Sequence, residues 1–290
     1  MVARLHHDRV AAAAPAAWAF LTHGIYGSGG NWRTIARQVT SRRPEWGFVL
    51  VDLRQHGRSE PGPPPHTVDA CADDLAALAQ ELAAAGQPIS VAVGHSFGGK
   101  VVLALRPRLR PAQTWVLDAA PGARPHAWEA ADNSVRDVWA SMRALDHDWP
   151  SREAFVAAMT GRGHAPALAH WIAMNLAPAA GAAGATGGLR LRLDLDAVRA
   201  LLLDHYARDA WPELTDPGLP GEVHIVLAAH SSAVTADERA RLAALPPPVH
   251  VHVVDAGHWL HVDAPAAVVD LLATHLPAPL PIRPGDPDAR

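Results

Sequence analysis

Short runs of consecutive apolar residues recur along the first half of the chain and again near its end. They are rich in Val, Ile and Leu, and they lack the clean alternation of apolar and polar residues that a half-solvated strand shows. This pattern is typical of strands buried on both faces. We therefore predict strands at Ala17–Leu21, Phe48–Leu53, Ile89–Val93, Trp115–Leu117, Val223–Leu227 and Val249–Val254.

Segments with apolar residues at helical spacing alternate with these strands. Thr67 is a good N-cap, and Cys71 lies on the apolar stripe of the helix that follows it, so we interpret Cys71 as a packing residue. Strands that alternate with helices predict a mostly parallel sheet with helices on both faces. The helices are expected at Trp32–Val39, from Thr67 to Gly86, at Phe97–Leu105 and from Asp263 to His275.

One stretch, from about Pro121 to Pro212, breaks this alternation. It has helical patterns but no convincing strand, which predicts a helical cap at 121–212, inserted after the strand that ends at Asp118. The sheet core would then comprise 1–120 and 213–276. The Ala/Gly-rich segment Pro178–Gly188 is expected to be a mobile loop, and the Pro-rich tail 277–290 to be poorly ordered. The cap helices are expected at Ala130–Leu145, Arg152–Met159, Ala167–Leu176 and Leu195–Tyr206.

Composition limits the class of protein. The chain has 290 residues, 49% of them hydrophobic and 19% charged, which suits one large globular domain or one domain with an insertion. A formal net charge of −4 offers no basic surface for nucleic acid.

A single cysteine excludes an internal disulfide and is compatible with a reducing compartment. The apolar stretch Val10–Leu21 contains Pro15 and is too short to span a membrane, so we expect a cytoplasmic protein without stable membrane insertion. The oligomeric state is open.

The segment Gly94-His95-Ser96-Phe97-Gly98 has the small-x-Ser-x-small pattern of a nucleophile elbow. In such an elbow the serine occupies a tight strand-to-helix turn, where side chains two positions before and after it would collide. Glycine at both positions meets that requirement. A buried strand is predicted before the segment and a helix after it, so we favour Ser96 as a nucleophile over an idle serine in a glycine-rich turn.

A serine hydroxyl needs a base to act as a nucleophile, and that base needs an acid to orient it. His258 follows the last predicted strand and is the best candidate base, whereas His261 is expected to be a loop or supporting residue. The usual place for the acid is the loop after Val223–Leu227, which has no carboxylate until Asp237. Asp118 ends the preceding strand, at the active edge of an open α/β sheet, and is preferred over Asp237.

A tetrahedral intermediate needs two backbone N–H donors. The residue after the nucleophile, Phe97, should supply one, and Ile25, in the loop after the first predicted strand, the other. His23 in the same loop is expected to be structural. Three aromatic residues are candidates for the pocket wall, with core packing as the alternative: Tyr26, Trp32 and Trp259.

Two further histidines, His250 and His252, share one face of a predicted strand, a spacing that can bind metal. Because the sequence suggests no third ligand nearby, we interpret both as structural and expect no metal site.

Taken together, four segments resemble the α/β-hydrolase superfamily in order and spacing: His23–Ser28, Asp52–Ser59, Gly94–Lys100 and Gly257–His261. More narrowly, the chain is similar to the small bacterial YbfF-type esterases and their eukaryotic abhydrolase relatives. The cap segments at Asn175-Leu176, Leu189–Asp196 and Trp211-Pro212 support this narrower resemblance.

The resemblance implies an α/β-hydrolase fold and a serine esterase that acts on a small-molecule carboxylic ester or thioester without a metal or organic cofactor. It also implies an acid after the strand that follows the nucleophile helix, which matches Asp118. Within the superfamily the alternatives are a C–C hydrolase, a lyase or a perhydrolase. A non-catalytic ligand-binding protein is the alternative from another class.

Overall fold

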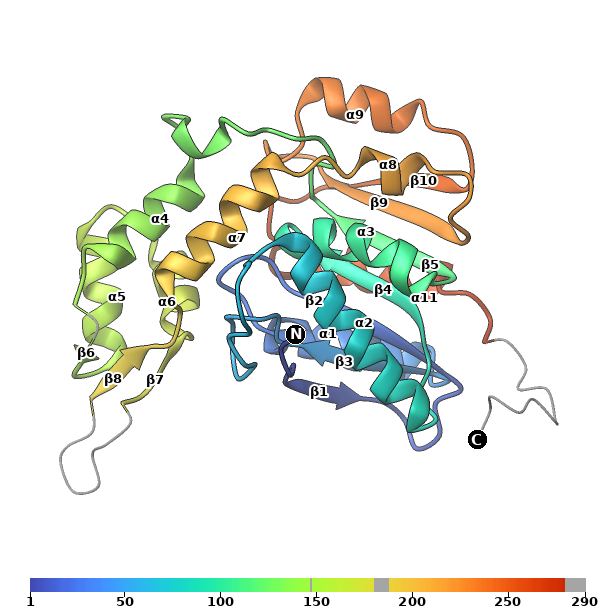
Figure 1. The fold of residues 1–290 in the computed structure, drawn as a ribbon, viewed down its shortest axis with the longest axis horizontal. Helices are drawn as coiled ribbons and strands as arrows, with labels where there is room; N and C mark the ends of the chain where they lie inside the picture. Colours follow the sequence, from blue (N-terminus) through green and yellow to red (C-terminus); the bar gives the residue numbers. More distant parts are fainter. Residues whose placement is uncertain (147, 180–187, 280–290) are drawn as a thin grey trace.

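Among the residues that the structure describes, seven strands form the central sheet in the order β1-β3-β2-β4-β5-β9-β10 (Figure 1). The computed structural model describes residues 1–146, 148–179 and 188–279. All neighbouring strands are parallel except β1, which pairs antiparallel with β3. The strands are β1 (His7–Val10), β2 (Ala17–Thr22), β3 (Trp46–Val51), β4 (Ile89–His95), β5 (Gln113–Leu117), β9 (Glu222–Ala228) and β10 (Val249–Val254).

The six predicted strands are thus confirmed, and β1 is an addition that the sequence did not reveal. Its four residues, His-Asp-Arg-Val, are mostly polar and only partly buried, so they show no apolar run. The edge position explains this composition, because an edge strand is covered less than a central one.

Helices cover both faces of the sheet, as the strand composition predicts. One face packs against α1 (Arg33–Arg42) and α11 (Pro265–His275), through Ile35 and Leu272 among others. The other face packs against α2 (Val68–Ala84) and α3 (Phe97–Leu109), and Cys71 of α2 is fully buried there. The core also includes α8 (Trp211–Thr215), α9 (Ala236–Ala243) and α10 (Leu260–Asp263), with the short helix η1 (Gly29–Trp32) before α1.

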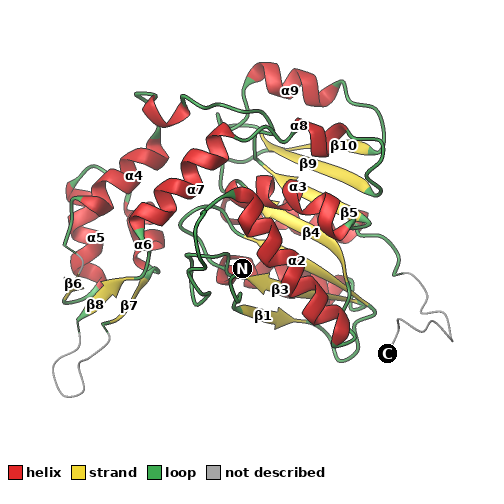
Figure 2. Ribbon diagram, in the orientation of Figure 1, coloured by secondary structure: helices red, strands yellow, loops and turns green. Residues whose placement is uncertain are grey.

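Between β5 and α8 the chain leaves the sheet and forms a separate layer, which we call the cap (Figure 2). All four expected helices are present there, with some ends shifted by a few residues. They are α4 (Ser134–Arg143), α5 (Arg152–Gly161), α6 (Pro166–Ala173) and α7 (Leu195–Ala207), preceded by the short helix η2 (Ala127–Glu129).

The expectation that this layer has no strand is wrong. In the described part of this layer, three short strands form a small antiparallel sheet in the order β6-β8-β7. They have two or three residues each, which is too short to display a period of two in the sequence. The helix predicted at Ala167–Leu176 ends at Ala173 instead, and Leu176 is the first residue of β7. The strands are β6 (Asp148–Trp149), β7 (Leu176–Pro178) and β8 (Leu189–Leu191). Most of the predicted mobile loop (180–187) and of the tail (280–290) lies outside the described residues.

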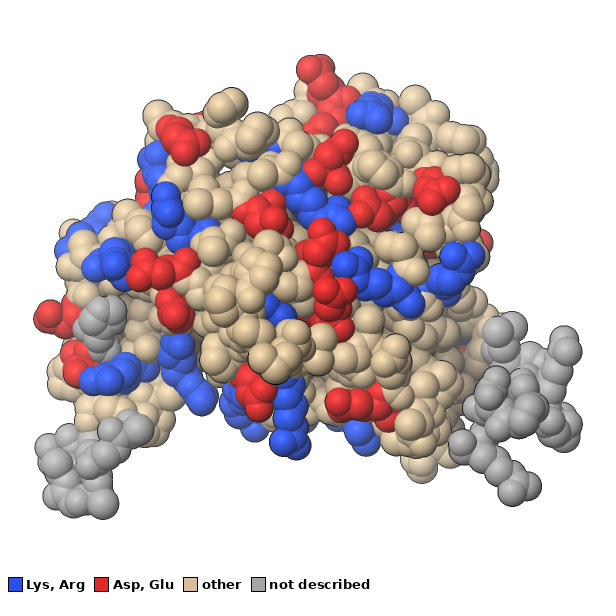
Figure 3. Space-filling model, in the orientation of Figure 1, with Lys and Arg blue, Asp and Glu red and all other residues tan. Residues whose placement is uncertain are grey.

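Acidic and basic side chains are interspersed on the face of the molecule shown in Figure 3, without a large area of one sign. In the part of the chain that the structure describes, we find no helix with the length and apolar character needed to cross a bilayer.

Candidate active site

Ser96 lies at the turn between β4 and α3, with φ 52° and ψ −116°. A non-glycine residue rarely adopts positive φ, so the turn holds Ser96 in a strained conformation. The turn is fixed by hydrogen bonds, in which the Ser96 N–H donates to the Leu117 carbonyl and the Gly99 N–H to the Ser96 carbonyl.

The two glycines that flank Ser96 are required by space. A Cβ atom on Gly94 would lie 2.1 Å from the Gly98 carbonyl oxygen. A Cβ atom on Gly98 would lie 2.7 Å from the His23 carbonyl oxygen. Neither position can carry a side chain unless the backbone moves, which confirms the collision predicted from the sequence.

Three side chains from distant parts of the chain form one line of hydrogen bonds. Ser96 Oγ lies 3.0 Å from His258 Nε2, and His258 Nδ1 lies 2.7 Å from Asp118 Oδ2. A carboxylate only accepts hydrogen bonds, so Nδ1–H donates to Asp118 and Nε2 is left to accept from the serine hydroxyl. The loops after β4, β5 and β10 bring the three together at the carboxyl ends of the strands.

Asp118 is completely buried, and the structure surrounds it with partners for its charge. Its Oδ1 accepts from the Ala228 N–H at 3.1 Å, and the Arg239 guanidinium lies 4.0 Å away. The alternative acid, Asp237, is exposed in the first turn of α9. The geometry therefore pairs His258 with Asp118.

Ile25 and Phe97 line the same cleft as Ser96. Phe97 is the first residue of α3, and the first N–H groups of a helix have no partner within the helix. The positive end of the helix dipole adds to this capacity to bind negative charge.

Two buried histidines, which the sequence analysis did not assign to the site, support the loop that carries Ile25. His23 Nε2 accepts from the Leu53 N–H at 3.0 Å, and its Nδ1 faces the Gly24 carbonyl at 2.8 Å. His56 Nε2 accepts from the Tyr26 N–H at 3.2 Å. The structural role expected for His23 fits this position, whereas His56 was missed because only the folded chain brings it to the loop.

His95 is a second residue that the sequence analysis passed over. Its Nε2–H donates to the His258 carbonyl at 2.7 Å, so it holds the loop that carries the candidate base. Burial lowers the pKa of His95 well below its ordinary value, which keeps the ring uncharged. His261 packs with its ring centroid 4.9 Å from that of His95, and burial lowers its pKa to about 4.

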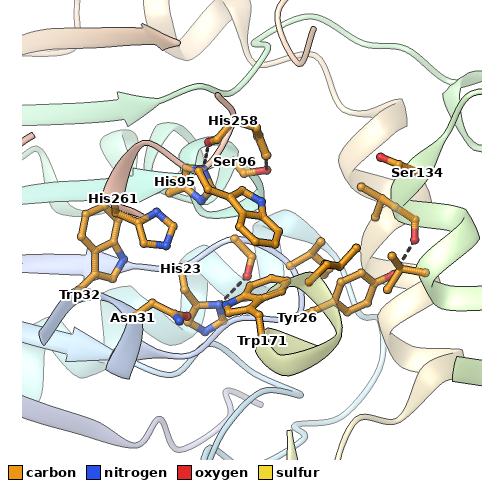
Figure 4. A pocket seen from close by; sticks show the side chains of 16 residues that line it. His23, Tyr26, Asn31, Trp32, His95, Ser96, Ser134, Trp171, His258 and His261 are labelled. Carbon is orange, nitrogen blue, oxygen red and sulfur yellow. Dashed lines mark hydrogen bonds between the residues drawn. The ribbon is translucent and has the colours of Figure 1, made fainter. Parts of the chain in front are cut away.

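A cavity of about 130 Å³ opens beside Ser96 and His258 (Figure 4). All three aromatic residues expected in the pocket wall line it, namely Tyr26, Trp32 and Trp259. The cap closes the other side with Val138 and Leu168, and with Trp171, whose ring packs 5.0 Å from that of Trp259. Most of the wall is apolar, so the cavity suits an apolar group.

A second, more polar cleft of about 430 Å³ also reaches Ser96 and His258. The cap contributes Arg124, Asn133 and Tyr206 to its wall. The serine hydroxyl thus lies where an apolar cavity and a polar cleft meet.

The premise that no third ligand lies near His250 and His252 is wrong. Strand β9 places His224 directly beside His250, and Glu222 lies two residues before His224 on the same face. These side chains were missed because they come from a neighbouring strand, and strand pairing is not visible in the sequence.

The fold and this site place the chain in a known class. The sequence model of the alpha/beta hydrolase family matches residues 19–271, so the chain belongs to that family.

Among its relatives, sn-1-specific diacylglycerol lipase ABHD11 of Mus musculus is 28% identical over 265 residues, which are 88% of this chain and 79% of the relative. Esterase YbfF of Escherichia coli (strain K12) is 26% identical over 264 residues, 88% of this chain and 91% of the relative. A marine microorganism esterase of known structure superposes with a TM-score of 0.77 at 19% identity, covering 94% of this chain and 100% of its own. These findings confirm the predicted fold and resemblance, and relatives named as esterases or lipases support an enzyme.

Proposed function

We propose that this protein is a serine hydrolase that cleaves carboxylic esters of small acyl groups through an acyl-enzyme intermediate. The observation that carries the proposal is the hydrogen-bonded line of Ser96, His258 and Asp118 at the mouth of an apolar cavity. A hydroxyl bonded to a neutral imidazole, itself bonded to a buried carboxylate, is the arrangement that activates serine for acyl transfer.

In the proposed first step His258 Nε2 takes the Ser96 proton while Ser96 Oγ attacks the acyl carbonyl carbon. The N–H groups of Ile25 and Phe97 stabilise the resulting oxyanion. His258 then gives its proton to the leaving alcohol as the carbon–oxygen bond breaks. In the second step His258 activates water, which releases the acid and restores Ser96. Asp118 holds the imidazole tautomer and stabilises its positive charge in both steps.

The cavity supports a small acyl group. An apolar cavity of about 150 Å³ holds a molecule the size of benzene, so a space of about 130 Å³ accommodates only a short or compact chain. The polar cleft is the natural place for the leaving alcohol, because its wall offers donors and acceptors. A thioester would be cleaved by the same steps.

Replacement of the proposed nucleophile tests this function. Ser96→Ala should lower kcat on p-nitrophenyl butyrate by about 10⁴-fold or more, because no group remains to form the acyl-enzyme. It should also abolish labelling by a fluorophosphonate probe. The matched control is Ser41→Ala, at an exposed serine on α1, which should retain both activity and labelling. A Ser96→Ala enzyme that hydrolyses the ester as the parent does would refute the proposal.

The same assay on the parent, run with esters from acetate to decanoate, tests the acyl preference. We expect kcat/KM to be highest for the short chains, since longer chains exceed the cavity. No turnover of any ester, combined with intact fluorophosphonate labelling, would favour other chemistry of the same fold, such as C–C bond hydrolysis. Absence of both turnover and labelling would favour a non-catalytic binding protein.

A further inference from the structure

Polar side chains gather at the amino-terminal ends of β9 and β10, at the opposite end of the parallel strands from Ser96. Glu222 opens β9, and His224 follows it on the same face. His250, the second residue of β10, pairs with His224 in the register of the two strands. Each of the three side chains offers one ligand atom, and the three atoms lie within 4.8 Å of one another.

The separations are compatible with a shared ion, and the shorter one is also that of a long hydrogen bond. Glu222 Oε2 lies 3.4 Å from His224 Nε2, and Glu222 Oε1 lies 4.0 Å from His250 Nε2. Tetrahedral bonds of about 2.0–2.1 Å place neighbouring ligand atoms about 3.3 Å apart. Glu222 and His250 are 49% and 41% exposed, so both side chains have room to rotate the small distance that closes the site.

The buried member of the set is held in position by its neighbours. His224 is 3% exposed and stacks on Trp115 with ring centroids 4.0 Å apart. Its Nδ1 lies 3.0 Å from His252 Nε2, which orients the ring so that Nε2 points toward Glu222.

The Glu222 carboxylate is also held in position by a hydrogen bond. Gln113 Nε2 donates to Glu222 Oε2 at 2.7 Å, and the same amide is fixed by its contacts with Trp115 and with the His275 carbonyl. Metal ligands are typically oriented by such outer hydrogen bonds. The cluster therefore has both the donor atoms of a metal site and the supports that usually accompany them.

We propose that Glu222, His224 and His250 bind one divalent transition-metal ion, with Zn²⁺ the best match. Two imidazoles and one carboxylate suit Zn²⁺ and its neighbours in the first transition row, whereas Mg²⁺ and Ca²⁺ require mainly oxygen ligands. Water completes the coordination on the exposed side. The ion joins β9 to the edge strand β10, so it stabilises the folded chain at the end of the sheet remote from Ser96.

Zinc binding to the full-length, tag-free protein, freed of metal with a chelator, tests the proposal. Equilibrium dialysis should show one Zn²⁺ bound per chain, and Zn²⁺ should raise the midpoint of thermal unfolding. Glu222→Gln and His250→Ala should each weaken Zn²⁺ binding by about tenfold or more and remove the thermal shift. Both residues are half exposed, so circular dichroism spectra should match that of the parent.

The matched control is another histidine–carboxylate pair, at the opposite end of the same two strands. His230 Nε2 lies 2.6 Å from Asp255 Oδ1, and the two side chains are 70% and 91% exposed. His230→Ala should therefore bind Zn²⁺ as the parent does. The proposal is overturned if the parent shows no saturable binding, or if Glu222→Gln and His250→Ala bind Zn²⁺ with unchanged affinity. The second result would place the ion at another histidine, such as His258. Neither result depends on ester hydrolysis, so the proposed function is tested separately.

Discussion

Asp118 carries the most demanding part of the proposed mechanism, because it is completely buried and contacts His258 only through Oδ2. Asp118→Asn preserves the size of the side chain but removes its charge. The amide can donate to His258 Nδ1, which would turn the imidazole to the tautomer that cannot accept the Ser96 proton. We expect kcat to fall by about 10³- to 10⁴-fold on a short-chain p-nitrophenyl ester at neutral pH.

The alternative acid provides the control for this measurement. Asp237→Asn should leave kcat within about twofold of the parent, since Asp237 is an exposed surface residue. If instead Asp237→Asn abolished turnover and Asp118→Asn did not, the hydrogen bond between Asp118 and His258 would have no part in catalysis.

The residues with a chemical pattern of their own were accessible from the sequence. The flanking glycines indicate Ser96 as the candidate nucleophile. The positions of His258 and Asp118 after buried strands indicate them as the candidate base and acid. His56 and His95 have no such pattern, because their roles consist of hydrogen bonds to backbone atoms at Tyr26 and His258. Contacts of that kind depend on how loops pack against each other, which spacing along the chain does not encode.

At the scale of elements, α3 joins the site to the cap through Lys100, the only lysine in the chain. Its Nζ donates to the carbonyls of Gly122, His205 and Arg208 at 2.9, 2.8 and 2.7 Å. Gly122 lies where the chain enters the cap, and the other two lie at the end of α7, where it leaves. An ammonium group has three donors, and here each has a partner. Burial lowers the pKa of Lys100 to about 8.

Lys100→Met should therefore loosen both connections of the cap. It leaves three carbonyls without their charged donor, which should lower the free energy of unfolding by about 3 kcal/mol in urea titrations. Hydrogen exchange should increase in α7 relative to the central strands.

The variant Lys100→Arg keeps the positive charge but changes the shape of the donor group. A planar guanidinium cannot place three donors around one point, so this variant should be destabilised as well. If Lys100→Arg had the stability of the parent, positive charge alone would explain the contact. Because Lys100 is the only lysine, an amine-specific reagent that modifies its side chain in the native parent would also contradict a closed connection.

Elements were predictable where they bury an apolar run or stripe, and the structure contains all the strands and helices that were predicted. Helix α9 has eight residues but was missed, because Leu242 is its only buried residue. Strand β1 lacks an apolar run, and β6, β7 and β8 have too few residues to show any period. We propose residues 121–212 as the extent of the cap, so its boundaries with the sheet core stay a prediction.

For the whole molecule, the buried histidines predict sensitivity to acid. Burial lowers the pKa of His23 to about 4 and that of His56 to about 3. Each Nε2 accepts from a backbone N–H, so protonation would replace an acceptor by a donor that faces another donor. The folded chain therefore keeps both rings neutral, whereas the unfolded chain protonates them near pH 6.5.

The sign of the pH dependence follows from this difference. Above about pH 6.5 both states hold the rings neutral, and the two histidines add no pH dependence. As the pH falls below that value the unfolded state binds more protons, so stability is lost until the folded rings titrate near about pH 4 and about pH 3. At about pH 5 each of the two histidines should lower the free energy of unfolding by about 2 kcal/mol, since one pKa unit corresponds to about 1.4 kcal/mol.

Urea unfolding at about pH 7.5 and about pH 5 measures this loss. His56→Gln should lose less free energy of unfolding than the parent between the two pH values. Gln cannot titrate, yet it offers an oxygen to accept from the Tyr26 N–H. Equal stability of the parent at both values would show that protonation of these rings is tolerated by the fold.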